Sequence, residues 1–284
     1  MPIKAQSPSQ ESSFRAFVSI VGSSFLRPAA VHCTVSIFRN FFFLQYKAAL
    51  LPGRYPVSQV DHPLDEKIPF RPCKVKIYLD FLHFFIRAMG FLLRCFKRCS
   101  AEVSAEVKDA IESLGAVYKK AAEVYVKNFS TTNRPKYLAR FRFLVIHIFD
   151  PHLMCIPSLH VMVVIRTYTL FRAILRNLGE ENSHLTQIEE VRQGALTITE
   201  AVLYVKQHSV NCISAAMYAM TRFDDLFPPN EAKGFAQDLF RNAEDIPERD
   251  AEAIRNHIID LYQSFLDQKS PSWEKPLLDF LSSQ

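Results

Sequence analysis

Two cationic side chains in the middle of the chain have a spacing suited to a phosphate. Lys127 stands at the expected end of a helix, a polar turn follows, and Arg134 comes directly before Pro135. Lysine supplies a point charge and arginine a bidentate fork, the two side chains best suited to holding a phosphate dianion. The alternative interpretation is a solvent-facing basic helix end.

A serine and a histidine follow at the expected start of an apolar helix, in the stretch Cys155-Ile-Pro-Ser-Leu-His160. Backbone N–H groups at a helix N-terminus attract anions, and the Ser158 hydroxyl adds a donor. His160 would then be placed to protonate a departing alkoxide oxygen. The alternative is a capped core helix with a hydrogen-bonded histidine.

The third stretch places Lys206 and His208 in an otherwise apolar segment. Burying both is costly unless they pair or bind something, and His208 is the candidate nucleophile that would form a phosphohistidine. Cys212 follows four residues later, on the same face of the expected helix. A carboxylate there would orient the imidazole, whereas a thiol is a weak donor that ionises reluctantly.

Together these stretches resemble the motifs of the type 2 phosphatidic acid phosphatase superfamily, which includes bacterial acid phosphatases and vanadium haloperoxidases. The resemblance covers roughly residues 75–225, with the motifs in 127–212. The first two family motifs, Lys-six residues-Arg-Pro and Pro-Ser-x-His, are matched by Lys127, Arg134, Pro135, Pro157, Ser158 and His160.

The third family motif, Ser-Arg, five residues, His, three residues, Asp, is matched only at His208. Its Ser-Arg pair would fall on Ala201 and Val202, and its aspartate on Cys212. The sequence Lys-Gln-His is similar to a variant in some membrane members, in which Lys206 would supply the missing charge from a different position.

The resemblance implies a metal-independent phosphatase or phosphotransferase that needs no cofactor and acts on a phosphomonoester, a lipid phosphate in particular. Lys127, Arg134, Lys206 and the amides near Ser158 would stabilise the transferring phosphoryl group. His208 would attack phosphorus, and His160 would protonate the leaving oxygen and then activate water. One alternative is a catalytically weakened or inactive member that binds a phospholipid headgroup or a protein partner. Another is an unrelated soluble helical protein.

Composition agrees with a folded protein that meets anions. Apolar residues make up 49% of the chain and only seven glycines are present, which excludes a disordered or collagen-like protein. Residues 1–230 carry 28 Lys/Arg and 18 Asp/Glu, whereas residues 231–284 carry 6 and 11. A basic body with an acidic tail suits anionic ligands or membranes. We find no nucleic-acid-binding motif and expect no such partner.

Charges interrupt every candidate membrane span. A spanning helix needs roughly 18–20 mostly apolar residues, but Arg15, Arg27 and Arg39 punctuate the N-terminal apolar region, and Asp80 and Arg87 the next one. We therefore expect membrane association, integral or peripheral, with a soluble cytoplasmic protein as the alternative. The six cysteines lack disulfide or zinc spacing and are expected to be free thiols.

The periodicity predicts an all-α helical bundle with the phosphate site between core helices. We expect a disordered N-terminus (1–12), a helical phosphatase-like core (14–227) and an acidic, amphipathic helical extension (231–284). Within the core, helices are expected over 14–52 with a break near Arg27, and over 75–98, 101–128, 136–149, 158–177 and 188–223, the last as one long helix that can bend.

Overall fold

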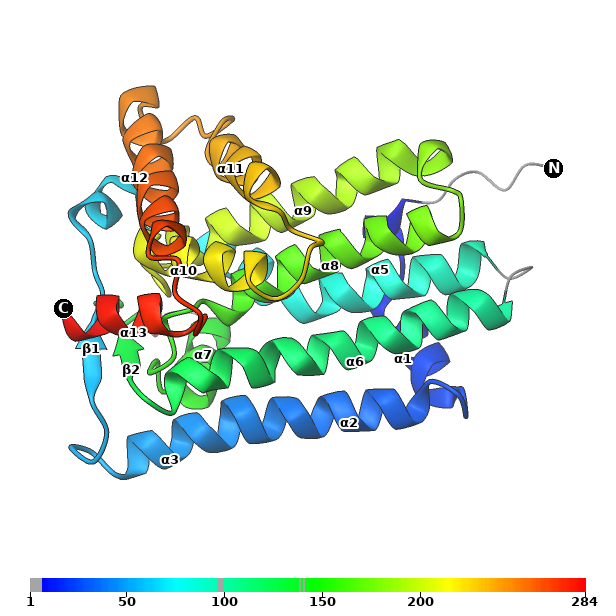
Figure 1. The fold of residues 1–284 in the computed structure, drawn as a ribbon, viewed down its shortest axis with the longest axis horizontal. Helices are drawn as coiled ribbons and strands as arrows, with labels where there is room; N and C mark the ends of the chain where they lie inside the picture. The colour runs from blue at the N-terminus through cyan, green and yellow to red at the C-terminus, as the bar shows by residue number, and fades with distance from the viewer. Residues whose placement is uncertain (1–6, 97–99, 138, 140) are drawn as a thin grey trace.

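The computed structural model describes residues 7–96, 100–137, 139 and 141–284, and almost all of its regular structure is helical (Figure 1). The prediction of an all-α helical bundle is confirmed. Four long helices lie side by side along the molecule in Figure 1, namely α5 (Phe81–Cys95), α6 (Ser100–Tyr125), α8 (Leu159–Asn177) and α9 (Leu185–Tyr204).

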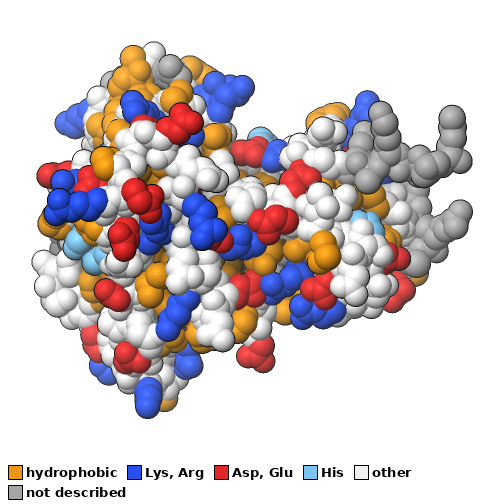
Figure 2. Space-filling view, turned by 90° about the horizontal axis from the view of Figure 1, so that it is seen from above, with side chains coloured by type: hydrophobic (Ala, Val, Ile, Leu, Met, Phe, Trp, Pro, Cys, Tyr) orange, Lys and Arg blue, Asp and Glu red, His pale blue; other side chains and the backbone are white. Residues whose placement is uncertain are grey.

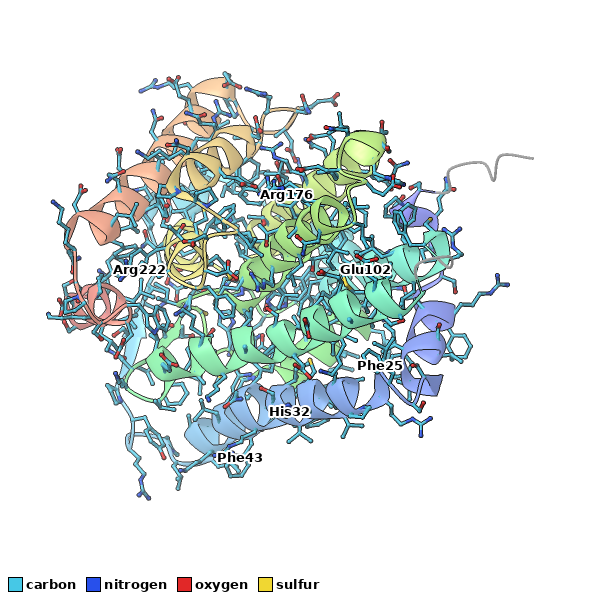
Figure 3. The ribbon with its side chains drawn as sticks, turned by 45° about the vertical axis from the view of Figure 1, so that its right-hand side comes forward. Phe25, His32, Phe43, Glu102, Arg176 and Arg222 are labelled. Atoms are coloured by element: carbon cyan, nitrogen blue, oxygen red, sulfur yellow. The ribbon has the colours of Figure 1, made fainter. Side chains whose placement is uncertain are left out.

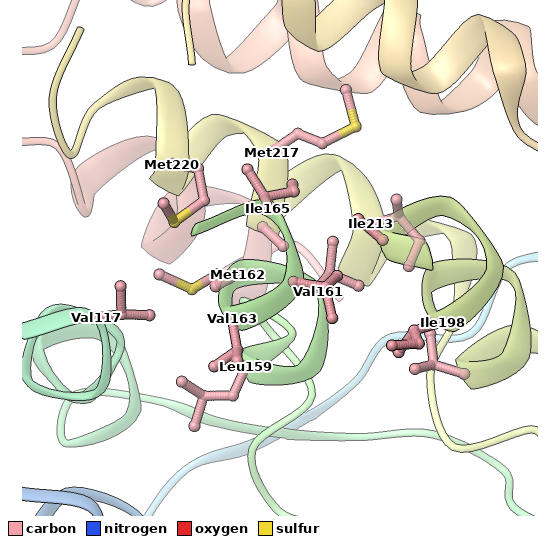
Figure 4. Packing of buried hydrophobic residues seen from close by; sticks show 14 of the residues in the cluster. Val117, Leu159, Val161, Met162, Val163, Ile165, Ile198, Ile213, Met217 and Met220 are labelled. Carbon is pink, nitrogen blue, oxygen red and sulfur yellow. The ribbon is translucent and has the colours of Figure 1, made fainter. Parts of the chain in front are cut away.

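Helix α8 is the centre of the core, because every residue from Leu159 to Phe171 is buried. A helix that is apolar on all sides must be covered on all sides. Figure 4 shows Val161, Met162 and Ile165 of α8 surrounded by residues of three neighbouring helices, which are Val117 of α6, Ile198 of α9, and Ile213, Met217 and Met220 of α10 (Val210–Thr221). This packing fixes the position of the N-terminus of α8, and the candidate functional site lies beside that N-terminus.

The N-terminal region forms helix α1 (Ser13–Gly22) and then a rod. The rod consists of α2 (Arg27–Ile37), a π-helical segment η2 (Phe38–Phe43) and α3 (Leu44–Leu50), and it runs beside α6 along the lower edge of Figure 1. The break expected near Arg27 is confirmed. Among the described residues no single helix is long and apolar enough to cross a membrane. Helix α1 and the Arg27–Leu50 rod reach that length and apolar character only as a pair, and the pair is bent by 113°.

Several expected elements are shorter or divided. The helix expected over 75–98 is broken at Leu79 and Asp80 into α4 (Val75–Tyr78) and α5, and the Asp80 carboxylate at the break pairs with Arg87. Helix α7 (Phe141–Phe149) begins later than expected. A two-stranded parallel sheet pairs β1 (Val57–Gln59) with β2 (Phe129–Thr131), where a polar turn was expected. The short 3-10 helices are η1 (Pro8–Gln10), η3 (Pro63–Lys67), η4 (Pro72–Lys74) and η6 (Asn182–His184).

The prediction of one long helix over 188–223 is wrong. Helix α9 ends at Tyr204, and Lys206 then adopts a left-handed backbone conformation with φ of 55°. Ser209 begins the next helix, because its hydroxyl accepts a hydrogen bond from the backbone N–H of Asn211. His208 therefore lies in a turn before α10, and it does not share a helix face with Cys212.

The acidic C-terminal extension packs onto the bundle. It forms α11 (Pro229–Asp238), α12 (Glu248–Asp267) and α13 (Lys275–Ser282), and the buried residues Ile254, Ile258 and Tyr262 of α12 lie against α10. The outer surface of this part mixes acidic and basic side chains (Figure 2). The extension thus shares the hydrophobic core of the bundle.

Candidate active site

The two motif histidines lie side by side. His160 is in the first turn of α8 and His208 is in the α9–α10 turn, 48 residues later, yet Nδ1 of His160 is 3.4 Å from Nε2 of His208. Both rings are buried, each with 8% of the residue exposed. Tyr78 stacks on His160 with ring centroids 4.4 Å apart, and Phe81 covers the ring from another direction. The packing of α8 against α10 thus brings two sequence motifs to one point.

The surroundings keep His160 uncharged. Burial, followed by the neighbouring His208, holds the pKa of the His160 imidazole well below its usual range. A neutral imidazole has one donor and one acceptor nitrogen, so the pair can share a single proton in the contact between them. Within the described part of the chain, Nδ1 of His208 has no well-oriented hydrogen-bond partner.

Two of the three predicted cations line one cavity. Arg134 donates to the side-chain oxygen of Gln207, beside His208, at 3.2 Å and to the backbone carbonyl of Asp150 at 3.0 Å. The Lys206 ammonium donates to the backbone carbonyls of Asp65 and Ile68, and burial lowers its pKa. Both cationic residues face a cavity of about 970 Å³, whose lining also includes the carboxylates of Asp61, Asp65 and Glu66. The cavity therefore has a mixed charge, with Arg134 and Lys206 as its candidate contacts for an anion.

Lys127 lies elsewhere. Its ammonium donates to Oε1 of Glu274 in the C-terminal extension at 2.6 Å, and it does not line the cavity that Arg134 and Lys206 share. The first motif is therefore divided between two parts of the surface.

Ser158 occupies the N-cap position of α8, but its hydroxyl does not cap the helix. The hydroxyl is buried and has no hydrogen-bond partner among the residues that the structure describes. Ser158 is thus the N-cap residue, as expected, but its side chain makes no cap, and among the described residues its hydroxyl stays unpaired near His160.

Cys212 belongs to the start of α10. Its sulfur accepts a hydrogen bond from the backbone N–H of Ser209 at 3.4 Å. Burial raises the pKa of this thiol well above its usual range, and the thiol also hydrogen-bonds to Cys155. In the described chain no hydrogen bond joins Cys212 to His208, because the start of α10 turns the thiol toward Ser209 and Cys155.

A buried cysteine–histidine pair beside this site was missed in the sequence. The sulfur of Cys155 lies 3.7 Å from Nε2 of His152, and the same nitrogen is 2.8 Å from the Thr132 hydroxyl. Burial alone would raise the pKa of Cys155, but the hydrogen bond from Cys212 and the nearby His152 and His208 rings bring it well below its usual range. Burial, the largest single effect, would lower the pKa of His152, but the charge of Cys155, the hydrogen bond to it and the charge of Asp150 together raise that pKa.

The site is nearly closed. The space beside His160 and His208 measures about 10 Å³, and Phe41 and Gln45 of the N-terminal rod form one of its walls. Gln45 is held in place by a hydrogen bond from the backbone N–H of Leu153 at 3.0 Å. His152 lines both this space and the 970 Å³ cavity, so its side chain stands between the histidine pair and that cavity.

No protein-family model, curated protein or solved structure matches this chain. The resemblance to the type 2 phosphatidic acid phosphatases therefore depends on the three motifs. Among the described residues no three His, Cys, Asp or Glu side chains are grouped as metal ligands.

Proposed function

We propose that the protein is a phosphatase or phosphotransferase that acts on phosphomonoesters, lipid phosphates in particular, through a phosphohistidine on His208. The observation that supports this proposal most directly is the buried contact of 3.4 Å between His160 and His208. In the family that the motifs resemble, these two positions are the general acid and the nucleophile. Their proximity meets the first geometric requirement of that chemistry.

The reaction would proceed in two steps. The lone pair of His208 attacks phosphorus, the ester P–O bond breaks, and the leaving alkoxide takes a proton from His160. Water then attacks the phosphohistidine while His160 accepts its proton, the N–P bond breaks and phosphate leaves. A phosphate dianion beside the two rings raises the pKa of His160, so substrate binding itself would supply the protonated acid.

Substrate binding would have to separate the rings, because a space of about 10 Å³ does not hold a phosphoryl group. The 970 Å³ cavity is the proposed route, with Arg134 and Lys206 as anchors for the phosphate oxygens. Lys127 is not part of this proposal, since it is paired with Glu274.

The negative charge that an aspartate would provide is assigned here to Cys155. Its thiolate, paired with His152, interacts with the His208 ring, and it would stabilise the imidazolium that forms when His208 is phosphorylated. Cys212 would act through Cys155, by donating a hydrogen bond to its sulfur. It is therefore a positioning residue.

The test is hydrolysis of p-nitrophenyl phosphate and of phosphatidic acid by the purified protein without added metal. His208→Ala should abolish both turnover and the formation of an acid-labile phosphoprotein. His160→Ala should slow turnover by roughly 10²–10⁴-fold. His83→Ala, at an exposed position, is the matched control. Full turnover by His208→Ala would refute the proposal.

A catalytically inactive headgroup-binding protein is the second candidate, favoured by the positions of Lys127 and Cys212. Binding of inorganic phosphate that is lost in Arg134→Ala, without turnover of either substrate, would identify that function instead.

A further inference from the structure

The outer side of the N-terminal rod is apolar and uncovered. Val31, Val35 and Phe38 are 56%, 57% and 60% exposed, and they follow one another at the spacing of a single helix face. The opposite side faces α6, where the Ser36 hydroxyl donates to the carbonyl of Gly115 at 2.8 Å. The rod is therefore anchored on one side and presents its apolar stripe to the exterior.

The stripe continues onto α7. The Tyr46 hydroxyl donates to the carbonyl of Ile148 at 2.6 Å, which joins α3 to α7. Phe43, at the lower edge of Figure 3, is 68% exposed. We call the combined surface the outer apolar face, and it consists of Val31, Val35, Phe38, Phe43 and Leu50 of the rod and Phe141, Leu144, Ile148 and Phe149 of α7. Monomeric soluble proteins rarely expose so many large apolar side chains together.

The charged residues of the N-terminal segment that forms most of this face have one sign. Residues 12–60 include no aspartate or glutamate, whereas they include five lysines and arginines, all of them exposed: Arg15, Arg27, Arg39, Lys47 and Arg54. The face of the molecule in Figure 2, in contrast, mixes acidic and basic side chains. Exposed phenylalanines among cations without carboxylates match the two properties of an anionic lipid surface, an apolar interior beneath negative headgroups.

We propose that the outer apolar face docks on an anionic lipid bilayer, with the Arg27–Leu50 rod lying in the plane of the interface. The apolar stripe would enter the headgroup boundary, and Arg39 and Lys47 would contact lipid phosphates. The apolar composition that α1 and the rod share agrees with this placement.

The inner side of the same rod is a wall of the candidate active site. Phe41 and Gln45 close the space beside His160 and His208, while Phe38 and Phe43 of the same segment face outward. Docking would thus bring the membrane to within the thickness of one helix of the histidine pair. This consequence rests on the proposed function, and it would give a lipid phosphate a short path to His208.

Co-flotation of the full chain with lipid vesicles tests the docking face. The protein should float with vesicles of phosphatidylcholine and phosphatidylserine and much less with phosphatidylcholine alone. Raising the ionic strength should weaken the binding, because exposed charges are screened. Equal binding to both vesicle types would overturn the proposal.

Paired variants locate the surface. Phe38→Ser combined with Phe43→Ser should reduce binding to anionic vesicles at least about ten-fold. Arg39→Gln with Lys47→Gln should reduce it by roughly 25-fold and make it less sensitive to salt, since each cation near such a surface contributes about five-fold. Val126→Ser with Leu185→Ser, at positions 52% and 60% exposed outside this face, is the matched control and should bind as the wild type does. Circular dichroism confirms folding of each variant.

A protein partner would give a different result. If the wild type forms a dimer that Phe38→Ser with Phe43→Ser dissociates, and it binds no vesicles, the face is an interface between copies and the proposal is overturned.

The same experiments test the docking face and the phosphatase activity separately. His208→Ala should float as the wild type does. Loss of flotation with intact turnover of p-nitrophenyl phosphate would refute only the docking face, and flotation without turnover would refute only the phosphatase.

Discussion

The sulfur of Cys155 lies 3.7 Å from Nε2 of His152 in the interior of the protein, directly beside the His160–His208 pair. A thiol buried alone would stay protonated, as Cys33 does, whose pKa burial raises to about 11. At Cys155 the hydrogen bond from Cys212 and the nearby His152 and His208 rings lower the pKa of the thiol instead, which favours a thiolate beside an imidazolium. Cys155, two residues before the second motif, is thus the candidate source of negative charge next to His208.

The first prediction is that Cys155 is a thiolate at neutral pH. The ultraviolet absorbance of thiolate should be present in the wild type, lost in Cys155→Ser, and shifted to higher pH in His152→Ala, because the imidazolium that stabilises the anion is gone. Cys33→Ser is the matched control and should not change the titration near neutral pH. An unchanged absorbance in Cys155→Ser would show that the buried pair is neutral.

The second prediction separates the two basic residues of the first motif. Arg134→Ala should lower kcat/KM by roughly 30–1,000-fold, the usual effect of losing one group that stabilises transition-state charge. Lys127→Ala should leave it within about two-fold, because the ammonium is engaged by Glu274. Steady-state kinetics on p-nitrophenyl phosphate measures both. A loss in Lys127→Ala as large as that in Arg134→Ala would contradict the geometry.

Local signals in the sequence were sufficient for much of the fold. The periodicity over 101–128 and the Pro157-Ser158 start signal located α6 and α8 to within a few residues. The turn that contains His208 was missed because Val205 to Ser209 include neither glycine nor proline, and only the tertiary packing places Lys206 in a left-handed conformation.

The site was only partly predictable for the same reason. The resemblance predicted that His160 and His208 lie together, because both occupy positions of the family's motifs. The pairing of Lys127 with Glu274 joins residues 147 positions apart, and no local pattern signals it. The His152-x-x-Cys155 spacing was visible, but its meaning depends on Thr132 and Cys212, which only the fold brings near.

The third prediction concerns acid stability. Burial, with the stacked His62 ring, lowers the pKa of His257 to about 4. Below pH 6.5, the ordinary pKa of histidine, His257 takes up a proton in the unfolded chain but stays neutral in the native state. Its contribution to stability is therefore complete above about pH 6.5 and is lost as the pH falls toward about 4. Discounted for the partly exposed ring, the loss is about 1–2 kcal/mol.

His257→Gln keeps a donor for the Asn211 side-chain oxygen, which His257 contacts at 2.7 Å, and removes the titration. Urea unfolding across this pH range should therefore show a flatter profile for the variant. The exposed replacement His83→Gln should leave the wild-type profile unchanged. Identical slopes for the wild type and His257→Gln would assign the acid sensitivity to other groups.

The last prediction tests how tightly α1 is packed beneath its exposed phenylalanines. A Cβ at Gly90 would lie 2.3 Å from the Cβ of Ala16, so α1 and α5 can approach only because α5 has a glycine there. Gly90→Ala should lower the free energy of unfolding by about 1–3 kcal/mol, since both contacts belong to rigid helices. Gly234→Ala in α11, with nothing within 4 Å of the new carbon, should instead raise it by about 0.5–1 kcal/mol. If thermal unfolding gives changes in unfolding free energy of opposite sign for the two variants, the close approach of the helices, and not helix propensity, decides the effect at Gly90. A stabilising Gly90→Ala would mean that α1 is free to move away from α5.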